Sequence, residues 1–341
     1  MRHIADLQTI PAVGQRTATE LVDAGCTSVA DMHLPQYNKM LTSAQRIGLL
    51  YLDHINEPVS REEAEDVIEF IRYHISSKFE VHLMGSYRRD SSTLSDIDVL
   101  LFHPSYIHIP TPRPSALDFT RSRSRGKQPH PFNTGRPTVA QRQNSPLIQD
   151  VVHPLEAAGL LATPLMAGPR KWQGVALLPK KVDGAWEEVG VRLRDLRAKR
   201  GVYRRLDLNL APMKSRGAAM LALTGDVDFV RSLRVTACKL GMHLNEYGLW
   251  RWNTNVTAST PSASSTSTSP PSSSSSADED EEQEQKETED SEGMEDGFWE
   301  LIEGENEEGI MRELGMNYVP PDKRNFRFLK GSKRGRPRKG R

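Results

Sequence analysis

The chain has 341 residues, enough for two or three compact units. Its 37% hydrophobic and 26% charged residues are typical of a globular protein whose hydrophobic content is lowered by low-complexity segments. The formal net charge is +0, but an acidic excess in residues 278–308 balances a basic remainder, and residues 330–341 contain seven Lys or Arg and no acid, so we expect a polyanionic partner. The two cysteines, Cys26 and Cys238, and the lack of a membrane-length apolar run argue against a disulfide framework, a zinc site or a membrane protein, and fit a reducing intracellular compartment.

The first 56 residues are expected to form short helices around tight turns. Residues 17–24 show an Ala/Leu periodicity that Gly25 closes, and a second helical pair follows Pro35. The segment Ile-Pro-Ala-Val-Gly at 10–14 resembles a helix-hairpin-helix element, whose turn presents backbone groups to a DNA phosphate. An ordinary αα-hairpin is the alternative. Ala12 stands where the element usually has its first glycine.

The next segment combines a helix and two strands. Ser60 and Glu63 have the spacing of a capping box, which predicts the start of an amphipathic helix. A strand over 81–84, a Gly-Ser turn and a second strand over 97–102 follow in that order.

The stretch 85–98 between those strands predicts a site for a metal ion and a triphosphate. Asp96 and Asp98 stand at the head of an apolar strand, where residues i and i+2 share a face. Two carboxylates held that close repel each other unless a cation lies between them, and a divalent metal is the usual one. The Gly-Ser turn and the two arginines after it suit phosphate oxygens, because amide N–H groups and guanidinium groups both donate hydrogen bonds to phosphate.

A third carboxylate is expected to join this pair. Residues 104–146 are rich in Pro, Ser and Arg and predict a disordered basic insertion; a helix over 147–159 and a strand over 171–179 follow. Residues 203–210 alternate strictly, which predicts a half-buried strand with its leucines on one face and Asp207 on the other. A mid-strand aspartate needs a partner, and the Asp96 and Asp98 pair is the candidate.

The remaining third of the chain alternates ordered and low-complexity segments. We expect helices over 218–223 and 227–240, a strand over 244–252, a Ser-rich then acidic linker over 254–296, order from 298–302 and a helix over 306–314. The basic tail contains Arg-Gly-Arg-Pro at 334–337, which resembles a minor-groove AT-hook and would serve as a nuclear import signal. A solubilising tail is the alternative.

These motifs together resemble family X DNA polymerases, the family of DNA polymerases beta and lambda and terminal transferase. The resemblance rests on the helix-hairpin-helix segment, Gly-Ser-Tyr-Arg-Arg to Asp-Ile-Asp, Arg-Arg-Leu-Asp-Leu, Leu-Thr-Gly-Asp, Leu-Asn-Glu-Tyr-Gly-Leu-Trp and Leu-Gly-Met-Asn-Tyr-Val-Pro-Pro. It implies an α+β fold with a nucleotidyltransferase palm on a mixed or antiparallel sheet. The expected units are helix-hairpin-helix fingers at 1–56, a palm at 57–212, an α/β thumb at 213–328 and a basic tail at 329–341.

The resemblance also implies roles for individual residues. Asp96 and Asp98 would bind two Mg²⁺ ions, which Mn²⁺ can replace, and Asp207 would complete the ion that activates the primer 3′-hydroxyl. The residues implied for the nucleotide are Gly85, Ser86, Arg89, Ser95, Thr224 and Gly225. Those implied for DNA are Gln8, Ile10, Val13, Gly14, Arg205 and Arg234, with a monovalent cation at the carbonyls of the helix-hairpin-helix turn. For Arg88, a structural role and a functional role are both open.

Several positions depart from the family's pattern. Ser95 replaces a glycine, and Pro58 replaces an arginine that assists triphosphate binding, a loss of roughly 1.5–3 kcal/mol. The aromatic pair that crowds the sugar is here Ala222 and Leu223, and Val230 replaces an asparagine that contacts the incoming base. The family's amino-terminal lyase domain has no counterpart, so we expect no deoxyribose-phosphate lyase activity.

The leading hypothesis is a monomeric nuclear DNA-directed DNA polymerase that fills short gaps or joins ends in DNA repair, with gapped or broken duplex DNA and deoxynucleoside triphosphates as partners. One alternative is a catalytically weak scaffold that binds DNA ends. Another is a template-independent or ribonucleotide-tolerant nucleotidyltransferase; an RNA-specific enzyme is disfavoured by the helix-hairpin-helix.

Overall fold

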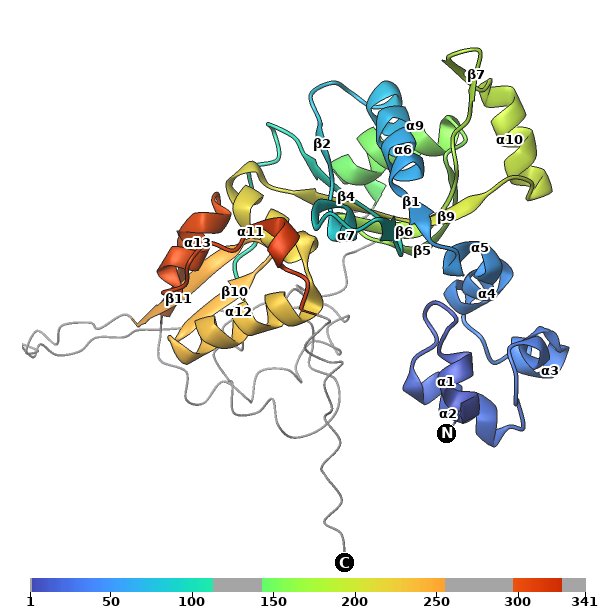
Figure 1. The fold of residues 1–341 in the computed structure, drawn as a ribbon, viewed down its shortest axis with the longest axis horizontal. Coiled ribbons are helices and arrows are strands. Elements are labelled where there is room, and N and C mark those ends of the chain that lie inside the picture. The colour runs from blue at the N-terminus through green and yellow to red at the C-terminus, as the bar shows by residue number, and fades with distance from the viewer. Residues whose placement is uncertain (1, 113–142, 255–296, 327–341) are drawn as a thin grey trace, which may run out of the picture.

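The computed structural model describes residues 2–112, 143–254 and 297–326, and Figure 1 shows their arrangement. Most of the insertion expected at 104–146, almost all of the linker expected at 254–296 and the basic tail at 329–341 lie outside the described residues. Within the described part, no helix has both the length and the apolar character that crossing a bilayer requires.

The amino-terminal segment is a cluster of short helices, drawn in blue at one end of the molecule in Figure 1. Its core is formed by apolar residues such as Leu7, Ile10 and Leu21. Gly25 has φ +95° and follows the end of the second helix, as its sequence position predicts. The elements are α1 (Arg2–Leu7), α2 (Gln15–Asp23), the 3₁₀ turn η1 (Ala30–His33), α3 (Pro35–Asn38), α4 (Ser43–Leu50) and α5 (Leu52–Asn56).

The turn between α1 and α2 contains a backbone position that suits glycine. Ala12 has φ +65°, a left-handed conformation that costs an L-residue roughly 1–2 kcal/mol. Its carbonyl accepts a hydrogen bond of 2.9 Å from Nε2 of the buried Gln45, so α4 holds the turn in this shape.

Ala12→Gly should therefore stabilise the protein, by about 1 kcal/mol once the larger backbone entropy of glycine in the unfolded chain is subtracted. Urea denaturation measures the change. Ala5→Gly, the same substitution at an exposed position within α1, is the matched control and should destabilise by about 1 kcal/mol. Equal losses for both variants would contradict the prediction.

The centre of the molecule is a five-stranded sheet with the order β2-β4-β9-β6-β5. The strands β4 and β9 are parallel, and the other neighbours are antiparallel. The strands predicted at 81–84, 97–102, 171–179 and 203–210 are confirmed to within a few residues; the bounds are β2 (Glu80–Leu83), β4 (Ile97–Phe102), β5 (Leu161–Ala167), β6 (Lys171–Leu177) and β9 (Tyr203–Ala211). The sequence did not predict β5, an edge strand that contains Pro164 and shifts register twice.

One face of this sheet is covered by helices. The capping box at Ser60 and Glu63 is present and begins α6 (Arg61–His74). The π-helical turn η4 (Ile148–Val152) and α9 (His153–Ala157) form the helix predicted at 147–159, and α6 and α9 lie on the same side of the sheet in Figure 1. Leucines of β9 pack against these helices in the main core, so the opposite face is left for Asp207.

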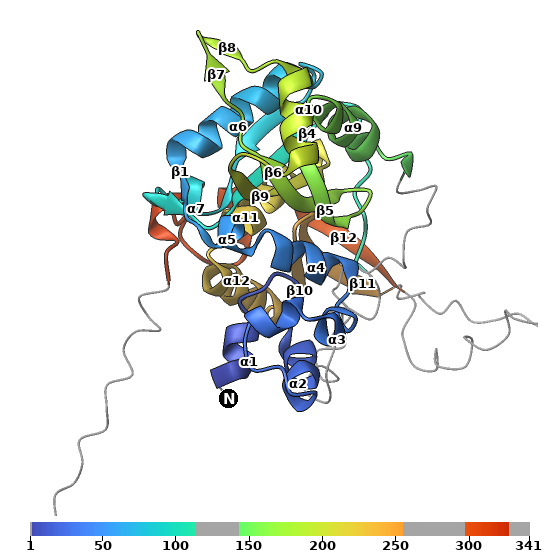
Figure 2. The same ribbon diagram turned by 90° about the vertical axis from the view of Figure 1, so that its right-hand side faces the viewer.

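Smaller elements surround the sheet. Strands β1 (Val59–Ser60) and β3 (Thr93–Leu94) pair with each other, and α7 (Gly85–Arg88) lies between β2 and β3 in the chain. The hairpin of β7 (Lys181–Val182) and β8 (Ala185–Trp186) and the helix α10 (Val189–Ala198), visible at one edge in Figure 2, were not predicted.

The carboxyl-terminal unit, yellow to red in Figure 1, packs its helices on a three-stranded sheet of order β10-β11-β12. The expectation of one strand over 244–252 is wrong, because the chain reverses inside it. The side chain of Asn245 makes this turn: its Oδ1 accepts hydrogen bonds from the amides of Tyr247 (2.9 Å) and Gly248 (3.0 Å). The elements are η5 (Met213–Ser215), α11 (Arg216–Thr224), α12 (Val227–Lys239), β10 (Met242–Asn245), β11 (Gly248–Thr254), β12 (Gly297–Glu303), α13 (Glu307–Glu313) and η6 (Pro321–Lys323).

Candidate active site

Three carboxylates meet on the sheet face that α6 and α9 leave uncovered. Asp98 in β4 lies directly opposite Asp207 in the parallel strand β9, and Asp96 immediately precedes β4. The three side chains offer oxygen atoms that all lie within 4.8 Å of one another. The register of two strands far apart in the sequence therefore brings together the aspartates that the sequence singled out.

A glycine makes room for this cluster. The expected Gly-Ser turn is instead the start of the one-turn helix α7. Gly85 has φ +57°, and a Cβ atom there would overlap the carboxylate of Asp98. The amide of Met84 donates a 2.9 Å hydrogen bond to the carbonyl of Asp98, which ties α7 to β4.

Burial and mutual repulsion oppose ionisation of the carboxylates in the cluster. Burial, then the negative charges of Asp96 and Asp207, raise the pKa of Asp98 to about 7, although Arg205 and Lys171 oppose that rise. Burial also raises the pKa of Asp207, against the opposing effects of Arg205 and of a hydrogen bond from Gln173. A bound cation would remove this cost of ionisation.

The donor atoms suit a divalent cation. All three ligands are carboxylates, the donor type that Mg²⁺ and Mn²⁺ prefer. Oδ1 of Asp207 is buried and makes no hydrogen bond within the described residues, with Nε of Arg205 3.5 Å away. Arg205 also pairs with Asp96 through Nη2. A buried carboxylate oxygen without a hydrogen bond, beside two further carboxylates, fits a divalent cation.

The candidate nucleotide residues fall into two groups. Arg89, the residue that follows α7, donates hydrogen bonds to the carbonyl of Thr224 and, through Nε, to Oδ1 of Asn325 at 2.9 Å. It also packs against Gly225, where a Cβ would lie 2.9 Å from Nη1. Ser95 is exposed beside the carboxylates and donates a 2.8 Å hydrogen bond to Asp96, and Ser86 is half-buried within α7.

An ion-pair network beside α7 is not predictable from any local sequence pattern. Arg88 donates to both carboxylate oxygens of Glu307, at 2.6 and 2.8 Å, and to Oγ1 of Thr224 at 2.6 Å. Arg324, fully buried, donates to the same carboxylate at 2.7 Å. Of the two roles left open for Arg88, these contacts establish the structural one, because they join α7 to α13. No sequence signal marked Glu307, which lies among many acidic residues.

A second missed residue is Gln173, the cross-strand neighbour of Asp207 in β6. Its Nε2 donates a hydrogen bond to Oδ2 of Asp207. The only sequence signal is a polar residue in the first half of a strand that ends in an apolar run, and that signal does not reveal which residue Gln173 faces.

The candidate DNA residues are spread over the molecule. Gln8, Ile10, Val13 and Gly14 lie together in the α1–α2 turn, whereas Arg205 lies in the carboxylate cluster. Arg234 is on the exposed side of α12. Gly14 is exposed, and a Cβ atom there would have no neighbour within 4 Å apart from the adjoining residues. The Ile10 carbonyl accepts a 3.1 Å hydrogen bond from the Val13 amide.

Three of the positions that depart from the family's pattern lie in the carboxyl-terminal unit. Ala222 and Leu223 are half-buried in α11. Val230 is only 9% exposed and belongs to the apolar core of this unit, so its side chain contributes packing and no hydrogen bond.

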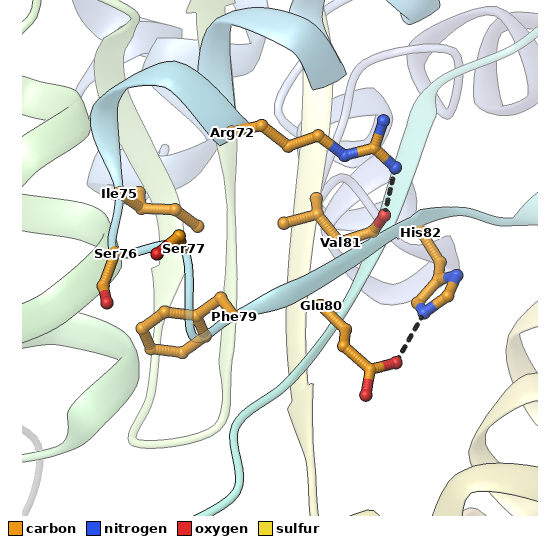
Figure 3. A pocket seen from close by; sticks show the side chains of 8 residues that line it. All are labelled: Arg72, Ile75, Ser76, Ser77, Phe79, Glu80, Val81 and His82. Atoms are coloured by element: carbon orange, nitrogen blue, oxygen red, sulfur yellow. Dashed lines mark hydrogen bonds and ion pairs between the residues drawn. The ribbon is translucent and has the colours of Figure 1, made fainter.

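A pocket of about 390 Å³ lies along the start of β2, and Figure 3 shows its lining. Nη2 of Arg72 donates a 2.6 Å hydrogen bond to the Val81 carbonyl, and His82 approaches Glu80 at 3.4 Å. Arg216 of α11 also pairs with Glu80 at 2.5 Å. These polar groups satisfy one another, and none of the three aspartates lines the pocket, so it is not part of the candidate site.

Comparisons with known proteins agree with this arrangement. Residues 6–56 match the model "Fingers domain of DNA polymerase lambda", residues 59–213 "DNA polymerase beta palm" and residues 219–325 "DNA polymerase beta thumb". A DNA polymerase lambda of Rattus norvegicus is 27% identical over 263 residues, which cover 72% of this chain and 36% of the relative. A DNA polymerase lambda of Arabidopsis thaliana is 30% identical over 107 residues, 30% of this chain and 20% of the relative. The similarity thus spans about a third or less of each relative's length.

Proposed function

Since the chain belongs to the family of DNA polymerases beta and lambda, we propose that it is a DNA-directed DNA polymerase that fills short gaps or joins broken ends in DNA repair. The observation that carries the proposal is the carboxylate cluster of Asp96, Asp98 and Asp207, with oxygens within 4.8 Å of one another, in the segment that matches a polymerase palm.

In this proposal the three aspartates hold two divalent ions. Asp96 and Asp98 would contact both, and Asp207 would complete the ion at the primer 3′-hydroxyl; Mg²⁺ is the proposed ion and Mn²⁺ its substitute. Bound there, the ions would supply Lewis-acid stabilisation of the attacking and leaving oxygens. The aspartates' own contribution is a rigid, partly buried set of anionic oxygens on neighbouring strands.

The other proposed contacts surround this cluster. Arg205 lies next to Asp96 and would approach the primer terminus, and Arg234 would reach the template strand. The turn carbonyls of Gln8, Ile10 and Val13 would bind the DNA backbone through a monovalent cation. The amide of Gly14 would donate a hydrogen bond to a phosphate. The triphosphate would be held by Gly85, Ser86, Arg89, Ser95, Thr224 and Gly225, of which Arg89, Thr224 and Gly225 are in contact.

The proposed partners are gapped or broken duplex DNA and deoxynucleoside triphosphates, and the proposed site of action is the nucleus, where a monomer would suffice. The basic tail that supports nuclear import lies outside the described residues. Its seven basic residues in 330–341 are the sequence support for this location.

Nucleotide incorporation on gapped, nicked and single-stranded primers, with deoxy- and ribonucleotides, tests the function. We expect Mg²⁺-dependent extension, fastest on the gapped duplex. We also expect weak discrimination against ribonucleotides, because Ala222 and Leu223 leave more room for a 2′-hydroxyl than an aromatic pair does. Template-independent addition to the single strand would assign a terminal transferase activity instead.

A scaffold that binds DNA ends without efficient incorporation is the second candidate. The observation that favours it is Val230, whose side chain is buried in the core and makes no hydrogen bond that could inspect a base. Binding of gapped DNA with no incorporation of either sugar, in Mg²⁺ or Mn²⁺, would establish this role and exclude the polymerase.

A further inference from the structure

We propose that Gln173 is a positioning residue for the metal site: its amide holds the Asp207 carboxylate so that one oxygen faces Asp96 and Asp98 and is available to a divalent cation. This inference rests on the proposed function, because it concerns the same carboxylate cluster.

The register of the sheet places Gln173 beside Asp207. Gln173 of β6 and Asp207 of β9 are direct partners across an antiparallel pair, so their side chains project from the same face at a Cβ separation of roughly 4.5–5.5 Å. That is the face opposite the helices, where the Asp98 side chain also lies. Gln173 therefore reaches Asp207 from the side away from β4, since β9 lies between β4 and β6.

The two carboxylate oxygens of Asp207 have different surroundings. Nε2 of Gln173 donates to Oδ2, whereas Oδ1 makes no hydrogen bond within the described residues. A carboxylate can only accept, so the amide nitrogen of Gln173 must be the atom that faces it. One oxygen is thus occupied by the protein, and the other is left for a ligand.

The side chain that donates to Asp207 is uncharged. Asp207 is 3% exposed and already has the guanidinium of Arg205 at 3.5 Å. A second cationic side chain at position 173 would compete with a metal ion for the carboxylate. A neutral amide orients the carboxylate without cancelling the negative charge that attracts the ion, and such outer hydrogen bonds typically contribute roughly 10–100-fold to metal affinity.

The test is a titration of the full chain with Mn²⁺, without DNA or nucleotide, in which electron paramagnetic resonance measures the bound ion. Gln173→Met keeps the length and flexibility of the side chain but removes the donor. We expect Mn²⁺ affinity to fall by roughly 10–100-fold and the Mg²⁺ concentration for half-maximal primer extension to rise in parallel. The KM for the nucleotide, measured at saturating Mg²⁺, should stay near the wild-type value.

Gln149→Leu is the matched control, because Gln149 is an exposed glutamine whose amide bonds the Gln143 carbonyl at 2.6 Å, and it should bind Mn²⁺ as the wild type does. Thermal unfolding identifies a variant that fails to fold, in which case Gln173→Leu replaces Gln173→Met. Equal Mn²⁺ affinity in a folded Gln173 variant and the wild type would overturn the inference.

The two proposals fail in different ways. If the wild-type protein binds Mn²⁺ at the cluster but incorporates no nucleotide, the proposed polymerase function is wrong. The Mn²⁺ affinity of the Gln173 variant then still tests the role of Gln173. A wild type that extends primers, with a Gln173 variant that is identical in Mn²⁺ binding and Mg²⁺ dependence, contradicts the role of Gln173 alone.

Discussion

Replacing Asp207 by asparagine should reduce primer extension by roughly 1,000-fold or more, because the substitution removes one anionic ligand from the proposed metal site, whose ions would supply several kcal/mol of transition-state stabilisation. The amide has nearly the same shape as the carboxylate and still offers an oxygen to Gln173, so the fold has no reason to change. Single-turnover extension of a gapped duplex in Mg²⁺ measures the loss.

The folded protein should not lose stability in the same variant. Burial raises the pKa of Asp207, so ionising this carboxyl at neutral pH opposes folding when no cation is bound. Asp207→Asn should therefore unfold in EDTA at the same temperature as the wild type or at a higher one. Lost activity together with preserved stability separates a catalytic ligand from a structural carboxylate.

Asp183→Asn is the control for this experiment, because Asp183 is exposed in the β7–β8 turn with φ +51°, a conformation that asparagine tolerates. It should extend primers at the wild-type rate. Extension by Asp207→Asn at a rate close to that of Asp183→Asn would contradict the metal-ligand role and the polymerase mechanism with it.

Replacing Glu307 by glutamine should destabilise the protein by about 3–5 kcal/mol, the usual cost of breaking a buried ion pair from one side. Glu307 lies between Arg88 and Arg324, whose side chains are 24% and 0% exposed. The amide cannot neutralise either guanidinium, and it can accept at only one of its two former oxygen positions. Urea denaturation at pH 7 measures the change in the free energy of unfolding.

The same ion-pair network predicts how the difference depends on pH. Burial alone would raise the pKa of Glu307, but the hydrogen bonds and charges of Arg88 and Arg324 outweigh burial and lower it below the ordinary value of 4.5. A carboxyl with a lowered pKa stabilises the fold above its unfolded-state pKa and loses that contribution as the pH falls through the folded-state pKa. The gap between wild type and Glu307→Gln should thus be full above pH 4.5 and shrink below it.

Glu308→Gln is the matched control, since Glu308 is the exposed neighbour in the same first turn of α13. It changes the charge near the helix N-terminus equally and should cost no more than about 1 kcal/mol. Losses of similar size for the two variants would show that the helix end, and not the network with Arg88 and Arg324, is responsible.

The sequence by itself determined the local parts of the site. The spacing of Asp96 and Asp98, the alternation around Asp207 and the Ser60 capping box are patterns within one segment, and segment-level patterns follow from the periods of strands and helices. They were enough to predict the strands of the carboxylate cluster, and their order supported the resemblance to a polymerase family.

Only the tertiary structure decided which side chains from distant segments face one another. The register that places Gln173 opposite Asp207, and the contact that joins Arg88 of α7 to Glu307 of α13, link residues 34 and 219 positions apart. Strand register and helix packing depend on how the whole core closes, and a polar residue in a strand looks the same in the sequence whichever partner it meets. The reversal at Asn245 was missed for a related reason, because a side-chain hydrogen-bonded turn interrupts an otherwise strand-like run.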